Sequence, residues 1–460
     1  NLTIDSGSNL YMDSGGNNMI EDLVVGGNLI LTGAMSGSQT SGSDIFVGGN
    51  WQNDGTTANF FPNSRAVFLN GTGTQTIAGT NASFPVFPYL FIDKTAGSVV
   101  LSRDVQVSTQ FVLSSSNVAN INAGSFTLNV SGTATTALDR QGSGHVIGNL
   151  RRGIGTGTNS YAYPIGDASN YTPVTLDFNN VTGAGNVTLK STAAEQSQIG
   201  SSGLDSTLSV NRYFTATNNA TTFTSYTATL NFVSGDRDAG ITTNDLLVGL
   251  YNATWSYPTV GTITATSIQA SGVASFGDFV IAECKSPAIY TVTGGGEYCS
   301  GSGGVDVSIN DSELGVSYQL KKDGVNVGSA VAGTGNTLCF GNQTATGLYS
   351  VLANSLATSG CNNTMTDSVL VNVNSVVIPS VSIGASATTF CDGTSVTFTA
   401  TPQFGGSTPS YQWKVNGSNV GTDNTTFSTS TLADGDVVTC VLTSSEECPS
   451  PATATSNSIE

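Results

Sequence analysis

A candidate pair of carboxylates lies in the run Gly235-Asp236-Arg237-Asp238, with Asp245 downstream. Two neighbouring carboxylates are the groups that glycoside hydrolases use to cleave a glycosidic bond. Several oxygen ligands in one turn are also what Ca²⁺ requires, although this run lacks the closing Glu of a complete calcium loop. A solvated loop is the first interpretation, and a calcium site at Asp236, Asp238 and Asp245 is the sharper hypothesis.

A Ser-His-Asp triad needs a histidine that acts as a base, and the chain contains a single histidine, His145. It lies between Gly144 and Val146 in a strand-like run, which predicts a side chain satisfied at the surface of a β-sandwich. The glycine-rich stretches 294–296 and 301–304 do not lie between a strand and a helix, so they predict turns and not a phosphate cradle. The sequence therefore predicts a protein that is not an enzyme and that holds no cofactor apart from the hypothetical calcium.

Cysteines are confined to the last two-fifths of the chain. The seven residues are Cys284, Cys299, Cys339, Cys361, Cys391, Cys440 and Cys448. None forms a CxxC pair, so zinc-ligand spacing is absent, and disulfides formed in an oxidising compartment are the simpler interpretation. Because seven is odd, at least one thiol lacks a partner within the chain, and Cys339 and Cys284 are the candidates.

Two disulfides are expected from the positions of these cysteines. Cys299 and Cys361 both flank the third predicted domain, which favours a bridge between them. In the fourth predicted domain, a Cys391–Cys448 bridge would join the two ends and leave Cys440 buried. A Cys391–Cys440 bridge is the immunoglobulin-like alternative. Each bridge is expected to stabilise the fold by roughly 2–4 kcal/mol.

The three tryptophans are the aromatic residues considered for stacking against glycans. Trp413 is expected in a domain core, because it lies on the strand-like run Tyr411-Gln412-Trp413-Lys414-Val415. Trp51 and Trp255 are the two candidates for surface rings. Nothing else in the sequence supports a carbohydrate-binding role.

The composition of the 460 residues is that of a β protein that carries little charge. Charged residues make up 10%, against roughly 25% in an ordinary globular chain, and short runs of Val, Thr, Ile, Phe and Tyr alternate with Gly, Asn and Ser. The net charge is -18, and the 13 Lys and Arg form no basic stripe, which disfavours nucleic acids and anionic lipid surfaces as partners. No stretch has the length and apolarity of a transmembrane helix.

The first predicted domain, residues 1–133, contains near copies of one segment. Leu23-Val24-Val25-Gly26-Gly27-Asn28-Leu29 and Ile45-Phe46-Val47-Gly48-Gly49-Asn50-Trp51 are offset by 22 residues, about one coil of a β-solenoid. Each coil is expected to point an apolar side chain inward at every second position, with Gly and Asn at the corners, where they tolerate left-handed backbone angles. A two-sheet sandwich is the competing interpretation.

Three further domains are expected, so that the fold class is all-β with a solenoid-like region followed by sandwich and immunoglobulin-like domains in series. Residues 134–285 predict one larger β-sandwich, and residues 286–375 have a length that suits an immunoglobulin-like domain. Residues 376–460 follow the Cys-Trp-Cys order of such domains. Their last strand is expected to be missing or barely begun, and we expect the natural chain to continue.

Several runs resemble segments of very large secreted proteins of Bacteroidota. Phe68–Ile77 followed by Leu90–Lys94 resembles their solenoid segments, and Gly144–Arg152 with Tyr163–Asp167 is similar to a sandwich module in the same proteins. In the last domain, 411–417 and 435–440 resemble their tandem immunoglobulin-like and PKD-like repeats. The resemblance implies export by a type IX-like route and a place in a cell-surface adhesin, such as the gliding adhesins.

The leading hypothesis is therefore a structural and adhesive segment of a long extracellular cell-surface protein that mediates attachment or surface motility. Its partners would be surface glycans, other proteins or neighbouring modules of the same chain. One alternative is a self-assembling filament subunit whose last domain accepts a strand from a neighbour. The other is a non-catalytic binding module of a larger secreted enzyme that acts on polysaccharides.

Overall fold

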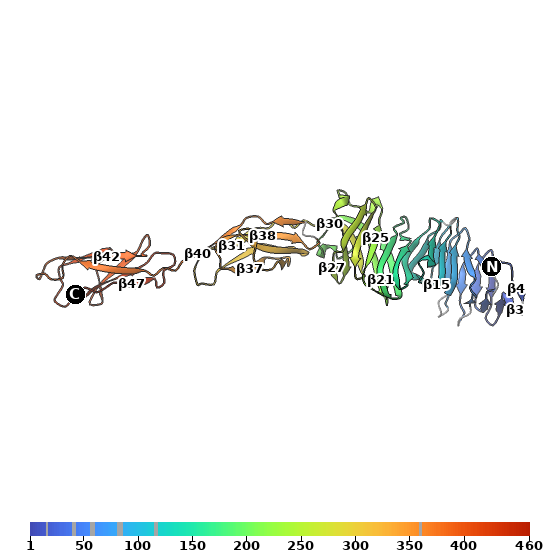
Figure 1. The fold of residues 1–460 in the computed structure, drawn as a ribbon, viewed down its shortest axis with the longest axis horizontal. Helices are drawn as coiled ribbons and strands as arrows, with labels where there is room; N and C mark the ends of the chain where they lie inside the picture. The colour runs from blue at the N-terminus through green and yellow to red at the C-terminus, as the bar shows by residue number, and fades with distance from the viewer. Residues whose placement is uncertain (15–16, 39–42, 56–59, 81–85, 115–117, 358–360) are drawn as a thin grey trace. The chain divides into compact units, whose positions relative to one another are not determined.

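The computed structural model of the chain describes residues 1–14, 17–38, 43–55, 60–80, 86–114, 118–357 and 361–460. In these ranges the regular elements are β-strands and single turns of 3-10 helix, so the predicted all-β class is confirmed. The turns are η1 (Thr135–Ala137), η2 (Ile199–Ser201), η3 (Ser234–Asp236) and η4 (Thr243–Asp245). The chain forms two compact units (Figure 1): residues 1–287, 314–316 and 354–362, and residues 288–313, 317–353 and 363–460.

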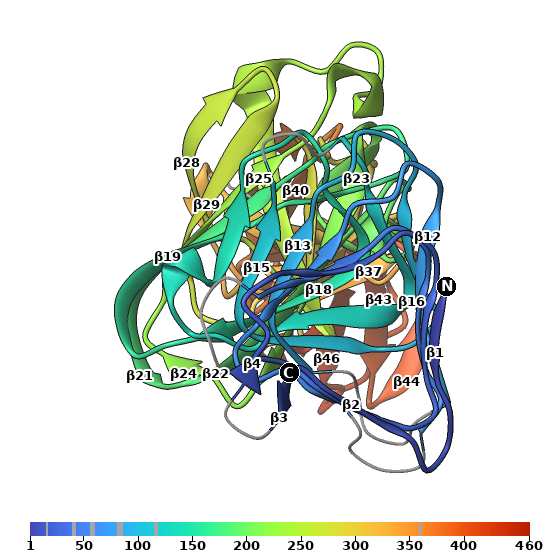
Figure 2. The same ribbon diagram turned by 90° about the vertical axis from the view of Figure 1, so that its right-hand side faces the viewer.

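The first unit begins with a solenoid of parallel strands, whose coils lie over one another in Figure 2. One ladder contains β5 (Leu23–Val25), β8 (Ile45–Val47), β11 (Ala66–Leu69), β13 (Val86–Ile92), β15 (Val105–Leu113) and β17 (Leu138–Arg140). A second contains β1 (Leu2–Ile4), β6 (Leu29–Leu31), β9 (Trp51–Asn53), β12 (Gln75–Ala78), β14 (Val99–Leu101), β16 (Ile121–Val130) and β18 (Val146–Ile154). A third, shorter ladder contains β2 (Asn9–Tyr11), β7 (Ala34–Ser36) and β10 (Phe60–Phe61).

The register confirms that the repeat of 22 residues is one coil. Leu23 pairs with Ile45 in the first ladder, and Leu29 pairs with Trp51 in the second. Alternate side chains point inward along each strand, and Ile45, Val47 and Trp51 are fully buried. The equal spacing in the two Gly-Gly-Asn segments thus places their apolar neighbours in one continuous core.

The corners of the first coils are joined by a ladder of asparagines. The backbone N–H of Asn50 donates to Oδ1 of Asn28 at 2.8 Å, and the N–H of Thr76 donates to Oδ1 of Asn50 at 2.8 Å. The glycines of these corners do not use the left-handed angles that glycine tolerates. Gly49 is required for space instead, because an added Cβ would overlap with the carbonyl carbon of Gly27 in the coil below.

A lysine is buried inside the solenoid at a later corner. Lys94 is fully inaccessible to solvent, and its Nζ donates to the carbonyl oxygen of Gly73 and to Oε1 of Gln75, each at 2.8 Å, and to the carbonyl oxygen of Gly71. Gln75 in turn donates to the carbonyl oxygen of Val47 at 2.8 Å. These two polar side chains satisfy main-chain carbonyls that would otherwise be buried without a donor.

β18 connects the solenoid to a sandwich, because it pairs in parallel with β16 and in antiparallel fashion with β22. The sheet continues through β22 (Gly185–Thr192), β23 (Leu204–Asn219), β30 (Asp278–Cys284), β26 (Leu246–Asn252) and β27 (Thr254–Ser256). The facing sheet contains β19 (Gly157–Tyr163), β21 (Val174–Gly183), β24 (Thr222–Phe223), β25 (Tyr226–Asn231), β29 (Ser267–Val273) and β28 (Thr259–Thr264). One cluster of buried apolar side chains runs from the solenoid into this sandwich.

The second unit contains two immunoglobulin-like modules. The first is built from β31 (Val292–Gly294), β33 (Val305–Ile309) and β37 (Leu338–Gln343), and from β32 (Gly296–Cys299), β40 (Val369–Asn374), β38 (Gly347–Ser355) and β34 (Val316–Lys322). The second is built from β41 (Ser380–Ala385), β42 (Val396–Gln403) and β45 (Thr426–Thr429), and from β44 (Ser418–Val420), β43 (Ser410–Val415), β46 (Val438–Thr443) and β47 (Thr453–Thr455). Beyond β47, Ile459 forms an isolated bridge with Val438.

The predicted disulfide pairing is wrong. Cys299 is bonded to Cys448, with their Cα atoms 5.6 Å apart, and Cys361 is bonded to Cys284, with their Cα atoms 6.3 Å apart. Cys391 is therefore an exposed free thiol. The prediction paired cysteines within one predicted domain, whereas each bridge joins cysteines of adjacent predicted domains.

The strand ends explain why Cys299 pairs across that boundary. β32 runs parallel to β40, so that Cys299 lies opposite Asn374, just before the last module begins. Val377 follows and donates its N–H to the carbonyl oxygen of Cys448 at 2.9 Å, which brings the two sulfurs together. Cys339 is free, and Cys440 is buried and unpaired, which excludes the immunoglobulin-like Cys391–Cys440 bridge.

Candidate functional site

The structure gives each of the three predicted calcium ligands a different environment. Asp236 is buried and accepts hydrogen bonds from the guanidinium of Arg212. Asp238 accepts from the N–H of Ser209 at 2.9 Å and from Nδ2 of Asn211 at 2.7 Å, while Asp245 is exposed at the end of η4. Within the described ranges no group of three or more acidic, histidine or cysteine side chains is arranged to hold a metal ion. Calcium binding stays a prediction, which melting temperatures measured in Ca²⁺ and in chelator would test.

Arg212 is the centre of a buried ionic network in the sandwich. Its Nε lies 2.7 Å from Oδ2 of Asp236, and its NH2 lies 2.5 Å from Oδ2 of Asp167. Burial would raise the pKa of Asp167, but hydrogen bonds from the Ser169 N–H and from Arg212 lower it below its ordinary value. The buried guanidinium of Arg212 is thus paired with two carboxyl groups from different segments of the sandwich, an arrangement that holds these segments together.

His145 belongs to the same region but is buried, not at the sandwich surface as expected. Its Nε2 lies 2.8 Å from the carbonyl oxygen of Asp167, and its ring is 5.7 Å from that of Tyr171. Burial lowers the pKa of His145, which favours the neutral ring at physiological pH. Its partner is a main-chain carbonyl rather than a nucleophilic hydroxyl, so the geometry provides no triad.

Two of the three tryptophans are buried and present no ring to solvent. Trp51 is fully buried in the solenoid, with its ring centroid 4.8 Å from that of Phe60 and 5.1 Å from that of Phe87. Trp255 is half-buried against Tyr251, at 5.1 Å between centroids. Trp413 is buried in the last module, as predicted. The interpretation of Trp51 as a surface residue is therefore wrong.

An outward-facing column of phenylalanines on the solenoid was missed from the sequence. Phe46 and Phe68 stack with centroids 4.4 Å apart, and Phe68 and Phe91 stack at 4.5 Å. The signal was present, because each phenylalanine is the central residue of an apolar triplet repeated every 22 or 23 residues. Since the ring faces cover one another, the column presents ring edges to solvent, and its first effect is to hold neighbouring coils in register.

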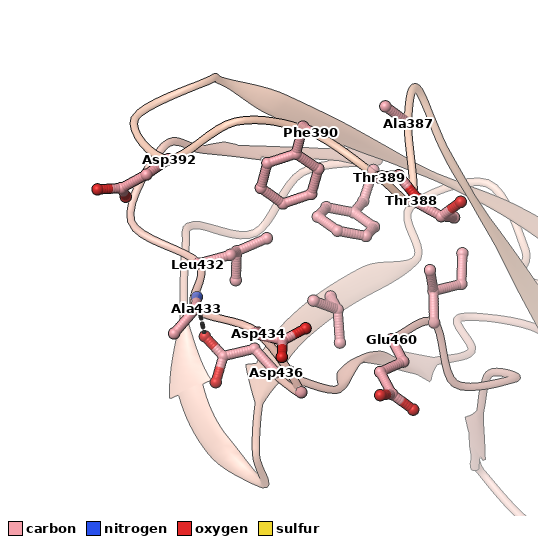
Figure 3. Close-up of a pocket in the computed structure, with 14 residues that line it drawn as sticks. Ala387, Thr388, Thr389, Phe390, Asp392, Leu432, Ala433, Asp434, Asp436 and Glu460 are labelled. Atoms are coloured by element: carbon pink, nitrogen blue, oxygen red, sulfur yellow. Dashed lines mark hydrogen bonds between the residues drawn. The ribbon is translucent and has the colours of Figure 1, made fainter.

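A pocket of about 710 Å³ in the last module is the candidate binding site (Figure 3). Its apolar wall consists of Phe390, Phe398, Leu432, Val438 and Ile459. Its acidic rim consists of Asp392, Asp434, Asp436 and Glu460. The loop between β41 and β42 supplies one side, and the turn before β46 supplies the side on which Figure 3 shows Asp434 and Asp436.

The turn on the acidic side of this pocket is held by Asp436. Its Oδ2 accepts the N–H of Ala433 at 2.7 Å, and its Oδ1 accepts from Nδ2 of Asn416 at 2.7 Å. Both hydrogen bonds lower the pKa of Asp436, and the one from Ala433 has the larger effect. The carboxylate of Asp436 therefore stays ionised. The apolar wall and the acidic rim suit a ligand with an apolar stem and a positive charge.

Comparison with known proteins supplies no family. No protein-family model matches the chain, and no curated protein matches its sequence. A chain in the crystal structure of a mouse coronavirus receptor-binding domain with its murine receptor is 16% identical, with a TM-score of 0.23 over 37% of this chain and 98% of that one. The Clostridium thermocellum CbhA fibronectin(III)-like modules are 14% identical, with a TM-score of 0.19 over 36% and 93%.

The N-terminal four Ig domains of Dscam1 isoform 6.44 are 11% identical, with a TM-score of 0.20 over 63% of this chain and 79% of that one. At these scores the likeness carries nothing about function, and the fold assignment rests on the strand pairing itself. Among the described residues, no helix is both long and apolar enough to cross a membrane.

Proposed function

We propose that the chain is a structural and adhesive segment of a long extracellular cell-surface protein. The observation that carries the proposal is the pair of disulfides, Cys284–Cys361 and Cys299–Cys448, which connect cysteines 77 and 149 positions apart in the sequence. Disulfides of this kind form and persist in oxidising environments. Two residues that the sequence offered as catalytic candidates are hydrogen-bonded within the fold. Asp236 accepts from Arg212, and the His145 ring bonds to a main-chain carbonyl oxygen.

The finer proposal concerns the kind of surface protein. The sequence runs that resemble secreted Bacteroidota proteins favour export by a type IX-like route and a role in attachment or gliding. The large excess of acidic over basic residues favours a segment that stays dispersed and engages a partner through local surfaces.

Surface labelling of intact cells that produce the parent protein tests this proposal. We expect an antibody raised against residues 1–460 to label unpermeabilised cells, and deletion of the segment to reduce attachment to a solid surface. Electron microscopy of the purified protein is a second test, because it measures the shape of the molecule. Labelling only after permeabilisation, or a single compact globule in the micrographs, would contradict the proposal.

A non-catalytic binding module is the second candidate, because the last module has a pocket with an apolar wall and an acidic rim. The ligand that matches this chemistry is a lysine or arginine side chain of a partner protein. We expect Asp392→Asn with Asp434→Asn to weaken binding of a lysine-rich probe peptide by about tenfold, as two charge interactions at a rim would. Glu446→Gln, an exposed acid outside the pocket lining, is the control and should leave binding unchanged.

A further inference from the structure

The two disulfides are interleaved along the chain. Cys299 lies inside the loop that Cys284 and Cys361 close, and its partner Cys448 lies outside that loop. Cys299 and Cys448 are 149 positions apart, so 148 residues lie between them. Cys284 and Cys361 are 77 positions apart and enclose 76 residues. The shortest covalent route between positions 284 and 460 therefore uses the second bridge and avoids almost all of both immunoglobulin-like modules.

We propose that the Cys299–Cys448 bridge carries tension past the two immunoglobulin-like modules, so that residues 300–447 bear no load and the extensible length of the chain depends on its redox state. Tension that reaches Cys284 follows residues 285–298 to Cys299, crosses the S–S bond and leaves through residues 449–460. The route through Cys361 and residues 362–447 is longer and stays slack. The inference rests on the proposed function, because load on the chain arises from attachment.

Both sulfurs of this bridge are held by neighbouring main chain. β32, which ends at Cys299, pairs with β40 from Gly296 opposite Val371 to Cys299 opposite Asn374. On the other side, Val377 donates to the carbonyl oxygen of Cys448, and Ser450 donates to the carbonyl oxygen of Val377, both at 2.9 Å. The bridge is thus an anchored part of the fold and not a link between two free loops.

Reduction would release the protected length. A small dithiol transfers two electrons and two protons to the bridge, so that Cys299 and Cys448 become thiols and the dithiol becomes a cyclic disulfide. Loss of both bridges adds 148 residues to the loaded path, which is about 500 Å at roughly 3.4 Å per extended residue. The modules then unfold under load, whereas the oxidised chain can lengthen in this region only by its two short flanking segments.

Single-molecule force spectroscopy on the full 460-residue chain, held at both ends, tests the proposal. We expect full unfolding of the oxidised protein to give a total contour length about 500 Å shorter than that of the same protein reduced with dithiothreitol. Equal lengths in the two states would overturn the proposal. Peptide mapping without reductant accompanies the measurement, and any pairing other than Cys299 with Cys448 would overturn it as well.

Removal of one bridge should lengthen the unfolded chain, whereas removal of the other should not. Cys299→Ser with Cys448→Ser leaves only the 76 enclosed residues protected, so the contour length should rise by 72 residues, or about 250 Å. Cys284→Ser with Cys361→Ser should leave the length unchanged, as should the control Cys339→Ser with Cys391→Ser, which alters free thiols. A gain in length from the Cys284 and Cys361 pair would contradict the assigned route. In situ reduction of the wild type gives the answer even where a variant fails to fold, and neither result depends on whether the protein attaches cells.

Discussion

Lys94 shows how a single charged residue is accommodated in the solenoid interior. Its ammonium group replaces water for the carbonyl oxygens of Gly71 and Gly73 and for the side chain of Gln75. Lys94→Met keeps the apolar stem and removes the donor, which leaves these acceptors buried and unsatisfied. We expect a loss of about 1–3 kcal/mol in unfolding free energy at pH 7, measured by urea titration with hydrogen exchange of solenoid peptides. Lys190→Met changes an exposed lysine and should have little effect.

The same residue predicts a pH dependence. Burial lowers the pKa of Lys94 in the folded protein to about 8, from an ordinary value of 10.5. Between these values the unfolded chain binds more protons than the folded one, so the stability that depends on Lys94 is lowest below pH 8 and rises toward pH 10.5. The difference in unfolding free energy between wild type and Lys94→Met should therefore be larger at pH 9.5 than at pH 7. A difference that shrinks with pH would contradict this assignment.

Arg212 makes a second prediction at the scale of one residue. Arg212→Met leaves the carboxylates of Asp167 and Asp236 without their shared cation, and the loss of one partner of a buried ion pair costs about 3–5 kcal/mol. Asp236→Asn should cost less, because Arg212 retains Asp167. The measurement is urea unfolding followed by hydrogen exchange in β23. Equal losses for the two variants would mean that Asp236 alone carries the interaction.

At the scale of elements, the stacking of corners determines which glycines are required. Gly49 lies directly over Gly27, and an added Cβ would overlap with backbone atoms there, whereas an added Cβ at Gly26 meets nothing within 4 Å. Neither glycine has a left-handed backbone angle, so the two differ in space alone. We expect Gly49→Ala to destabilise the solenoid by about 1–3 kcal/mol and Gly26→Ala to be neutral or slightly stabilising. Hydrogen exchange in β6 and β9 measures the loss of stability in each variant. Equal losses in the two variants would show that overlap of the added Cβ with the neighbouring coil is not the cause.

The elements that sequence reasoning found are those with a local signal. The 22-residue offset predicted the solenoid because each coil repeats the same apolar alternation, and Trp413 was placed in a core because its strand alternates clearly. The buried Lys94 had no such signal, since its acceptors come from a neighbouring coil. The disulfides were missed for the same reason, because strand ends far apart in the sequence bring Cys299 to Cys448.

At the scale of the whole molecule, the question is how many parts of the chain unfold independently. In the first unit the apolar core is continuous from Leu29 in the solenoid to Ile281 in the sandwich. β16 and β18 carry the parallel ladder directly into the sandwich sheet. A shared core of this kind predicts that solenoid and sandwich unfold together, because neither can lose its strands without exposing the buried face of the other.

Calorimetry with variants placed in different parts of the chain tests this prediction. Gly49→Ala in the solenoid and Arg212→Met in the sandwich should lower the midpoint of the same transition. Trp413→Phe weakens the core that Trp413 forms with Phe398 and Phe427 in the last module, so it should lower a different transition. If the first two variants shift separate transitions, the shared strands do not couple solenoid and sandwich, and the two behave as independent domains joined only by the chain.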